Sequence, residues 1–248
     1  MADYERATWT RSAAEAAQVD VGLREHMLRV YNYMASGLAL TGIVAWLVAN
    51  TPAVMQLFYT ETASGRIGMT GLGWVAVFAP LVLVFILSRG IVGQMRFSTA
   101  QALFWAYAAL MGVSLSSILL VYTGSSVART FFACAAGFAG LSLYGYTTKR
   151  SLNGLGQFLM MGVWGLLVAM LISFFWPSPG LSFVISIVGV LIFAGLTAYD
   201  TQKIKEMYWQ GDMGEVQSKK ALFGALQLYL DFINLFMFLI QFMGNRRN

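Results

Sequence analysis

The sequence has little of what soluble catalytic chemistry needs. It contains one cysteine, Cys134, and one histidine, His26. A single cysteine excludes an intramolecular disulfide and a zinc cluster. Because His26 precedes the first apolar run, no histidine is available inside a membrane bundle for a serine–histidine protease site. The sequence also lacks a P-loop, an H-E-x-x-H zinc motif and a Rossmann glycine fingerprint followed by an acid. A functional site must therefore use other residue types.

Charged residues are also scarce. They make up 11% of the 248 residues, against about 25% in soluble domains, whereas 58% are hydrophobic and the mean hydropathy is +0.66. The formal net charge of +5 does not indicate a nucleic-acid partner, because most basic residues flank apolar runs. The composition predicts an all-α integral membrane protein whose main partner is the lipid bilayer.

The first 29 residues differ from the rest of the chain. They mix both signs of charge and have no apolar core, so they are not a cleaved signal peptide. Apolar side chains recur at helical spacing at the end of this segment, at Leu23, Met27, Val30 and Tyr31. This spacing predicts a short interfacial helix that leads into the first span. We expect a cytoplasmic or interfacial segment (1–29) and a single transmembrane domain (30–248).

Seven segments are long and apolar enough to cross a bilayer, which takes about 20 residues. Pro177 and Pro179 mark the turn between the fifth and sixth segments, since proline disrupts helical hydrogen bonding. The predicted spans lie at 31–50, at 67–88, within 97–128, within 130–148, in the first half of 151–199, from about 181 to beyond 200, and at 221–243. The predicted fold class is a seven-transmembrane-helix bundle.

The basic residues of the short loops predict the orientation. If the N-terminus is cytoplasmic, that side receives most of them: Arg24, Arg29, Arg89, Arg96, Lys149, Arg150, Lys203, Lys205, Lys219 and Lys220. The far side receives only Arg66, Arg129, Arg246 and Arg247. The last two conflict with the rule if the seventh segment crosses the membrane. That segment either crosses fully or re-enters and returns to the cytoplasm, and both alternatives stay open.

Two aspartates interrupt the apolar runs. Asp200 ends the run 191–200, and Asp231 divides 221–230 from 232–240. A carboxylate near the centre of a bilayer costs roughly 2.5–3.5 kcal/mol on insertion scales. A chain seldom carries this cost twice unless the groups face each other or water. The pair is therefore the candidate functional site.

The neighbours of the aspartates indicate how they would act. Gln227 and Asn234 lie at i−4 and i+3 from Asp231, so one face of this helix is polar and belongs toward a cavity. An antiparallel hairpin through the polar loop before it brings Asp200 within a few turns of Asp231. Two carboxyls that meet in a low dielectric cannot both ionise, so they share a proton. Arg89, at the end of the second span, is the best-placed cation to hold the ionised pair.

Each of these residues also has a purely structural interpretation. Asp231 would be a buried carboxyl that holds helices together through polar neighbours. Asp200, three residues before Lys203, would be an interfacial acid at a helix end. Arg89 would be an arginine that snorkels to the interface. Residue spacing alone leaves these alternatives open.

Four segments resemble one known family. AYDTQKIK at 198–205 and LYLDFINLF at 228–236 resemble the two C-terminal signatures of the Bax inhibitor-1 family, in its bacterial branch. The segments 30–49 and 142–152 are also similar to bacterial members. The resemblance implies a seventh helix enclosed by the other six and a location in the bacterial inner membrane.

The resemblance also implies a function. The family is associated with a pH-sensitive calcium leak gated by an aspartate pair, which maps onto Asp200 and Asp231, with an arginine latch at the position of Arg89. Some members carry an acid within the second span, whereas 67–88 has none here. Calcium takes 6–8 oxygen ligands, so two carboxylates with amides and carbonyls suit transient passage of the ion. We expect calcium as a permeant ion and no resident cofactor.

Three functional hypotheses follow. The first is the pH-gated cation pathway, with Asp200 and Asp231 as sensor and gate. The second is a regulator without transport activity that binds a membrane protease or a cell-death factor. The third is an intramembrane aspartyl protease, but its Gly-x-Gly-Asp motif is replaced here by LYLD at 228–231, and Ala79-Pro80-Leu81 is in the wrong order and place for its Pro-Ala-Leu segment. We therefore expect that the protein is not an enzyme.

Overall fold

The computed structural model describes residues 2–61, 67–92, 95–212 and 214–247, and it is almost entirely helical. Within the described chain, seven helices are long and apolar enough to cross a membrane. They are α1 (Ala2–Asn50), α3 (Gly71–Val92), α4 (Phe97–Val121), α5 (Gly124–Thr147), α6 (Asn153–Phe175), α7 (Pro179–Glu206) and α8 (Glu215–Met243). The predicted fold class, an all-α membrane bundle of seven spanning helices, is confirmed.

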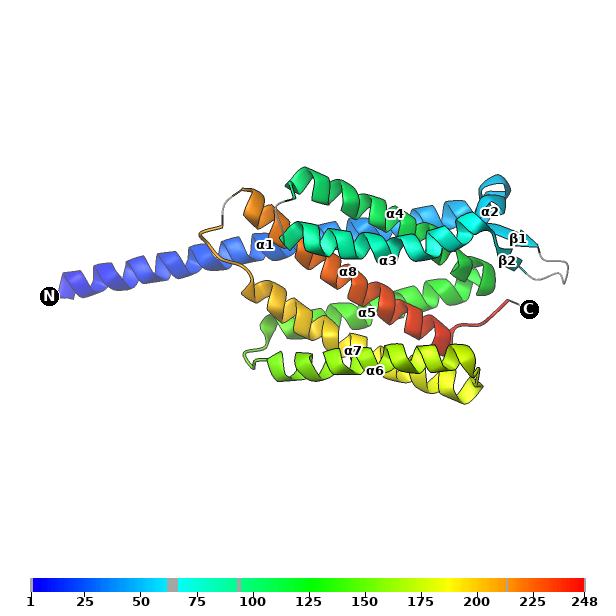
Figure 1. Cartoon of the computed structure of the whole chain (residues 1–248). Helices are drawn as coiled ribbons and strands as arrows, with labels where there is room; N and C mark the ends of the chain where they lie inside the picture. The colour runs from blue at the N-terminus through cyan, green and yellow to red at the C-terminus, as the bar shows by residue number, and fades with distance from the viewer. Residues whose placement is uncertain (1, 62–66, 93–94, 213, 248) are drawn as a thin grey trace.

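The N-terminal segment is continuous with the first span. The predicted helix before the first span is found, but it is longer than expected and continuous with that span, because α1 is a single helix of 49 residues. No proline occurs before Pro52, and the first 20 residues are rich in alanine and other good helix formers. Nothing in the sequence therefore breaks the helix, and its N-terminal part extends beyond the other helices (Figure 1).

A short capping element separates α1 from α3. Pro52 ends α1 and also begins the short helix α2 (Pro52–Phe58), where a proline at the first helical position costs no hydrogen bond. Strands β1 (Tyr59–Glu61) and β2 (Ile67–Met69) then form an antiparallel hairpin. The predicted second span began at 67, which is wrong, because 67–69 pairs with β1 and α3 begins only at Gly71. Arg66 lies outside the described residues.

The other turns lie close to their predicted positions. Only Tyr122 and Thr123 separate α4 from α5. Residues 124–128 therefore belong to the fourth span, although the third span was predicted within 97–128. The predicted proline turn is found where expected, and Pro179 begins α7 at the first helical turn. Arg129 consequently lies inside α5 and is exposed.

The last helix, α8, runs through the middle of the bundle (Figure 1). It packs against α1, α3, α4, α5 and α7, while α6 packs chiefly against α7. Fourteen of its residues are buried, among them the fully enclosed Leu222, Leu226 and Tyr229. The expected enclosure of the seventh spanning helix is therefore observed, with α6 in an outer position behind α7.

The α8 helix crosses the whole bundle and does not re-enter. It is one unbroken helix of 29 residues, which corresponds to about 43 Å at 1.5 Å per residue. The segment after it bonds to the connection between α4 and α5, with Thr123 N donating to Asn245 O at 3.0 Å and Arg247 N to Val121 O at 2.8 Å. The two chain ends consequently lie at opposite ends of the molecule (Figure 1). The terminal arginines belong to the end opposite the N-terminus.

Candidate functional site

The site forms where α7 and α8 pack closely in antiparallel directions. Glycines permit this approach at both ends of the contact. Gly224 of α8 faces Ile204 of α7, and Gly189 of α7 faces the ring of Phe238 of α8. A side chain at either glycine would meet these neighbours at less than ordinary contact distance. The helix pair is thus held in a fixed register between the two contacts.

The two predicted aspartates meet within this register. Asp231 is 4% exposed, and Asp200 is partly buried on the facing helix. Each carboxyl acts electrostatically on the other, so the two groups are near neighbours, although no hydrogen bond joins them among the described contacts. Two carboxyls this close together favour a state in which one of them carries a proton, because two carboxylates repel each other. The structure therefore brings together the two side chains that the sequence placed on adjacent spans.

The polar stripe on α8 is only partly satisfied. Asn234 Nδ2 donates to Leu230 O at 2.8 Å, so this amide is bound to its own helix. In contrast, Gln227 Oε1 and Asp231 Oδ2 are buried and have no donor among the described residues. Buried acceptors without a partner are rare in folded proteins. Gln227 and Asp231 are thus the members of the stripe that could bind a proton donor or a cation.

Arg89 does not contact the aspartates in this structure. It lies exposed in the last turn of α3. The ion pairs within the described parts of the chain are Arg29–Glu25, Lys219–Glu215 and Lys220–Asp212. The nearest cation along α7 is Lys203, one turn from Asp200, and its charge acts on that carboxyl. The role of Arg89 as a latch stays a prediction.

The segments 142–152 and 198–205, which carry part of the family resemblance, contact each other directly. Ser142 Oγ and Thr201 Oγ1 lie 2.9 Å apart, and Gly145 packs directly on the backbone of Ala198. Lys205 Nζ donates to Tyr146 O at 2.8 Å. These contacts fix α7 against α5.

Gln202 extends this contact to the connection between α5 and α6. Its Nε2 donates to Arg150 O at 2.9 Å, and its Oε1 accepts from Leu152 N at 2.7 Å. Both ends of one buried amide are therefore satisfied by a loop 50 or more residues away in sequence. These two bonds hold α7 at a position two residues after Asp200. In the predicted orientation, this position lies in the cytoplasm-facing half of the helix.

A second polar contact joins α8 to α1 and α4. The Tyr229 hydroxyl lies 2.7 Å from Thr41 Oγ1, which also lies 2.8 Å from Ala108 O. None of four hydroxyl-bearing residues in these contacts was predicted as a site residue: Tyr229, Thr41, Ser142 and Thr201. The only feature of the sequence that could have indicated them is that they lie in the four segments that resemble the family. Isolated hydroxyl groups in apolar helices have no diagnostic spacing.

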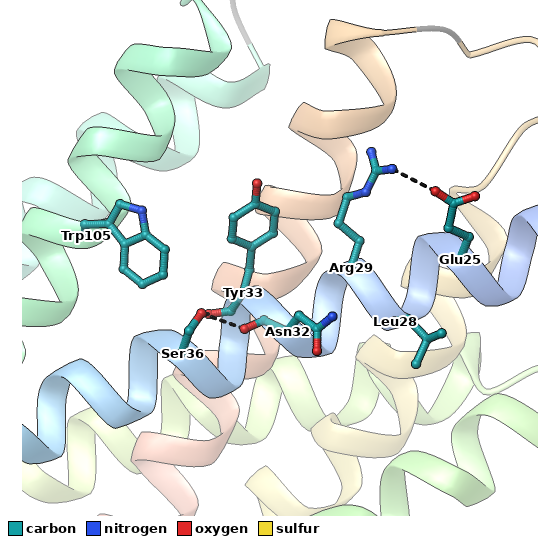
Figure 2. Close-up of a pocket in the computed structure, with 7 residues that line it drawn as sticks. All are labelled: Glu25, Leu28, Arg29, Asn32, Tyr33, Ser36 and Trp105. Carbon is teal, nitrogen blue, oxygen red and sulfur yellow. Dashed lines mark hydrogen bonds and ion pairs between the residues drawn. The ribbon is translucent and has the colours of Figure 1, made fainter.

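A surface pocket of about 380 Å³ lies on α1 next to α4 and is separate from the aspartates (Figure 2). Figure 2 shows the ion pair between Arg29 and Glu25, whose closest atoms are 3.1 Å apart, at one end of it. At the other end, Ser36 Oγ donates to the backbone oxygen of Asn32 at 2.6 Å. Its charged groups neutralise each other, so the aspartate pair remains the candidate site.

The fold and the site together define a polytopic α-helical membrane protein with a pair of carboxyl groups buried between its last two helices. Comparison with known proteins then identifies the group. The chain belongs to the Bax inhibitor-1 family, because the family model described as "Inhibitor of apoptosis-promoting Bax1" matches residues 23–248. The resemblance noted in the sequence is thereby confirmed.

The similar proteins are bacterial and cover nearly the whole chain. An uncharacterized protein of Rickettsia prowazekii is 45% identical over 248 residues, which is 100% of both chains. An uncharacterized protein of Caulobacter vibrioides is 47% identical over 252 residues, again 100% of both. The protein named inner membrane protein YbhL of Escherichia coli is 44% identical over 232 residues, covering 93% of this chain and 95% of its own.

Proposed function

We propose that the protein is a pH-sensitive leak pathway for cations, calcium among them, with Asp200 and Asp231 as sensor and gate. One observation carries the proposal: the two carboxyls are near neighbours at the contact of α7 and α8, where the buried Asp231 Oδ2 has no donor among the described residues. The cost of burying such a pair is high in a membrane, which favours a functional role. The proposed location is the bacterial inner membrane, with the N-terminus in the cytoplasm, in line with the name of the relative YbhL.

The charge of the pair sets the sign of the pH response. When the two carboxyls share one proton, they carry one negative charge. This charge attracts nearby cations, Lys203 in the structure and Arg89 in the proposed latch. As the pH falls, a second proton removes the charge and this attraction. We expect the packing around α8 to loosen and cation flux to rise on acidification.

Calcium is expected to pass through the site as cargo. The ion takes 6–8 oxygen ligands, whereas this site offers two carboxyls and the amide oxygen of Gln227. No group of three or more His, Cys, Asp or Glu residues that could hold a metal ion occurs in the described chain. Such a site binds weakly, and weak binding allows an ion to leave as readily as it enters.

Flux measurements on purified protein test this proposal. The protein is reconstituted into vesicles loaded with a calcium-sensitive dye, and the flux is measured from acidic to mildly alkaline pH. Wild-type flux should rise as the pH falls. Asp200→Asn and Asp231→Asn together mimic the neutral pair, so this double variant should show high flux that changes little with pH.

Glu206→Gln is the matched control, since it removes an exposed carboxylate from the end of the same helix. This variant should keep the wild-type pH response. Equal and pH-independent flux from the wild type and the double asparagine variant would show that the pair is not a sensor. If none of these proteins conducts above protein-free vesicles, the regulator that binds a membrane protease or cell-death factor becomes the better proposal.

The protease alternative finds no support in the packing. Leu228 and Tyr229, which precede Asp231, are fully buried. A protease must place an extended substrate chain beside its catalytic aspartates, and close-packed side chains occupy that space on α8. We therefore keep a non-enzymatic role in the proposal. Cleavage of a reporter helix by the wild type, lost in Asp231→Ala, would reverse this choice.

A further inference from the structure

A long apolar groove lies between α1 and α5, apart from the aspartates. Its volume is about 1030 Å³. Side chains of α1 and α5 form its walls, and Phe232 of α8 is the α8 residue that lines it. Several wall residues are small and exposed, including Ala35, Ala39 and Gly42 of α1 and Ala139 of α5. The groove therefore opens sideways, toward the position of the lipid in a membrane.

The residues at the groove change along its length from charged to polar to apolar. Arg24 and Tyr146 line one end, and Lys205, which is not itself a lining residue, donates to Tyr146 O at 2.8 Å. Tyr31 and Ser142 lie deeper, with their hydroxyls 2.6 Å apart. Tyr31 is seven residues from Arg24, about 10 Å along the helix. Beyond this hydroxyl pair, the lining is entirely apolar.

This order matches the order of chemical groups in a phospholipid. The cations correspond to the phosphate, the hydroxyl pair to the glycerol ester region, and the apolar walls to the acyl chains. Among the residues whose side chains the structure describes, none of those that line the groove is acidic. Basic pockets between spanning helices on the cytoplasmic side bind anionic lipid headgroups. Charge and polarity thus select an anionic phospholipid over a neutral lipid or an apolar helix.

We propose that the groove between α1 and α5 binds one anionic phospholipid from the leaflet on the N-terminal side, with its phosphate at Arg24 and Lys205 and its ester region at Tyr31 and Ser142. The site also lies next to the gate. Ser142 Oγ is 2.9 Å from Thr201 Oγ1, and Thr201 directly follows Asp200 in α7. The inference holds whether or not the protein conducts ions.

Native mass spectrometry of the full-length protein released from nanodiscs tests the proposal. The nanodiscs contain phosphatidylglycerol and phosphatidylcholine in equal amounts. The wild type should retain one phosphatidylglycerol molecule in preference to phosphatidylcholine. Arg24→Gln and Lys205→Gln together should lower this preference by about fivefold for each cation removed. The control pair Lys149→Gln and Arg150→Gln removes two exposed cations that, among the described contacts, neither line the groove nor bond through their side chains to a residue that lines it, so it should keep the preference.

A second variant tests the location independently of charge. Gly42→Phe places a large ring in the groove, and its Cβ meets no atom within 4 Å, so the helix itself tolerates the change. Gly137→Phe is the matched control on α5, since its Cβ is equally unhindered and it lies outside the groove. Loss of the lipid only in Gly42→Phe supports the site. Equal retention of both lipids by the wild type, or full retention by Gly42→Phe, would overturn it.

Discussion

Single hydroxyl groups join the helices of this protein in places where charged groups are scarce. Thr41 and Tyr229 connect α1 to α8, and Tyr31 and Ser142 connect α1 to α5. Hydrogen bonds of this kind between spanning helices average about 0.6 kcal/mol in measured cases. Their contribution is therefore small for each pair, and the larger cost arises when one partner is removed and the other stays buried.

This asymmetry predicts unequal effects at the Thr41–Tyr229 contact. Thr41→Val leaves the buried Tyr229 hydroxyl without its only hydrogen-bond partner among the described residues, which should destabilise the protein by about 1–3 kcal/mol. Tyr229→Phe should cost less, about 0.5–1.5 kcal/mol, because Thr41 Oγ1 still has Gly37 O and Ala108 O within reach.

Thermal unfolding in detergent measures both variants. Cys134 is the only cysteine of the chain and is fully buried, so a thiol-reactive fluorophore reports its exposure on unfolding. Ser36→Ala serves as the control, because Ser36 is exposed and bonds only to the backbone of its own helix. A larger loss of stability in Tyr229→Phe than in Thr41→Val would contradict the assignment of the shared bond.

At the scale of helices, one glycine determines how closely α5 approaches α7. A Cβ at Gly145 would collide with the backbone of Ala198, whereas a Cβ at Gly137 of the same helix meets no atom within 4 Å. Small residues in a spanning helix allow close approach only where a partner helix is present. The contact at Gly145 matters because Ala198 lies two residues before Asp200.

Gly145→Ala should therefore separate α5 from α7 and destabilise the protein by about 1–3 kcal/mol, as overpacking of a close contact does. Gly137→Ala should be neutral or slightly stabilising, because alanine is the better helix former by about 1 kcal/mol. The same Cys134 labelling assay compares the two variants. Equal stability of Gly145→Ala and Gly137→Ala would show that α7 yields at this contact without cost.

At the scale of the whole molecule, the two chain ends lie on opposite sides of the bundle (Figure 1). An odd number of crossings requires this arrangement, and the bridge between Tyr122 and Arg246 fixes the C-terminal segment at the far end. With the N-terminus in the cytoplasm, as the loop charges predict, the C-terminus lies in the periplasm.

Reporter fusions test this topology. Alkaline phosphatase, which is active only outside the cytoplasm, should be active when fused after Asn248 and inactive when fused at the connection between α7 and α8. A fluorescent protein that folds only in the cytoplasm should give the opposite pattern. Fluorescence without phosphatase activity at both fusion sites would exclude seven crossings. The inverse of the expected pattern would place the N-terminus outside the cytoplasm.

Hydropathy alone was sufficient to predict the seven spans and the adjacency of Asp200 and Asp231, because apolar runs and isolated charges are properties of local sequence. The groove and the contact between Tyr31 and Ser142 were not predictable, since these two residues lie 111 positions apart and follow no repeating pattern. The strand pair formed by 59–61 and 67–69 was missed for another reason. Its three-residue strands are too short to show an alternating pattern.

Hydrogen bonds at both ends of α8 limit how this helix can move. At one end, Lys220 Nζ donates to Met207 O at 3.0 Å, and at the other, Asn245 O accepts from Thr123 N at 3.0 Å. A helix anchored in this way cannot slide along its axis like a piston without breaking one anchor. Rotation and bowing of its middle, where Asp231 lies, remain available. A change in the charge of the pair would then be transmitted sideways, as a change in the width of the bundle.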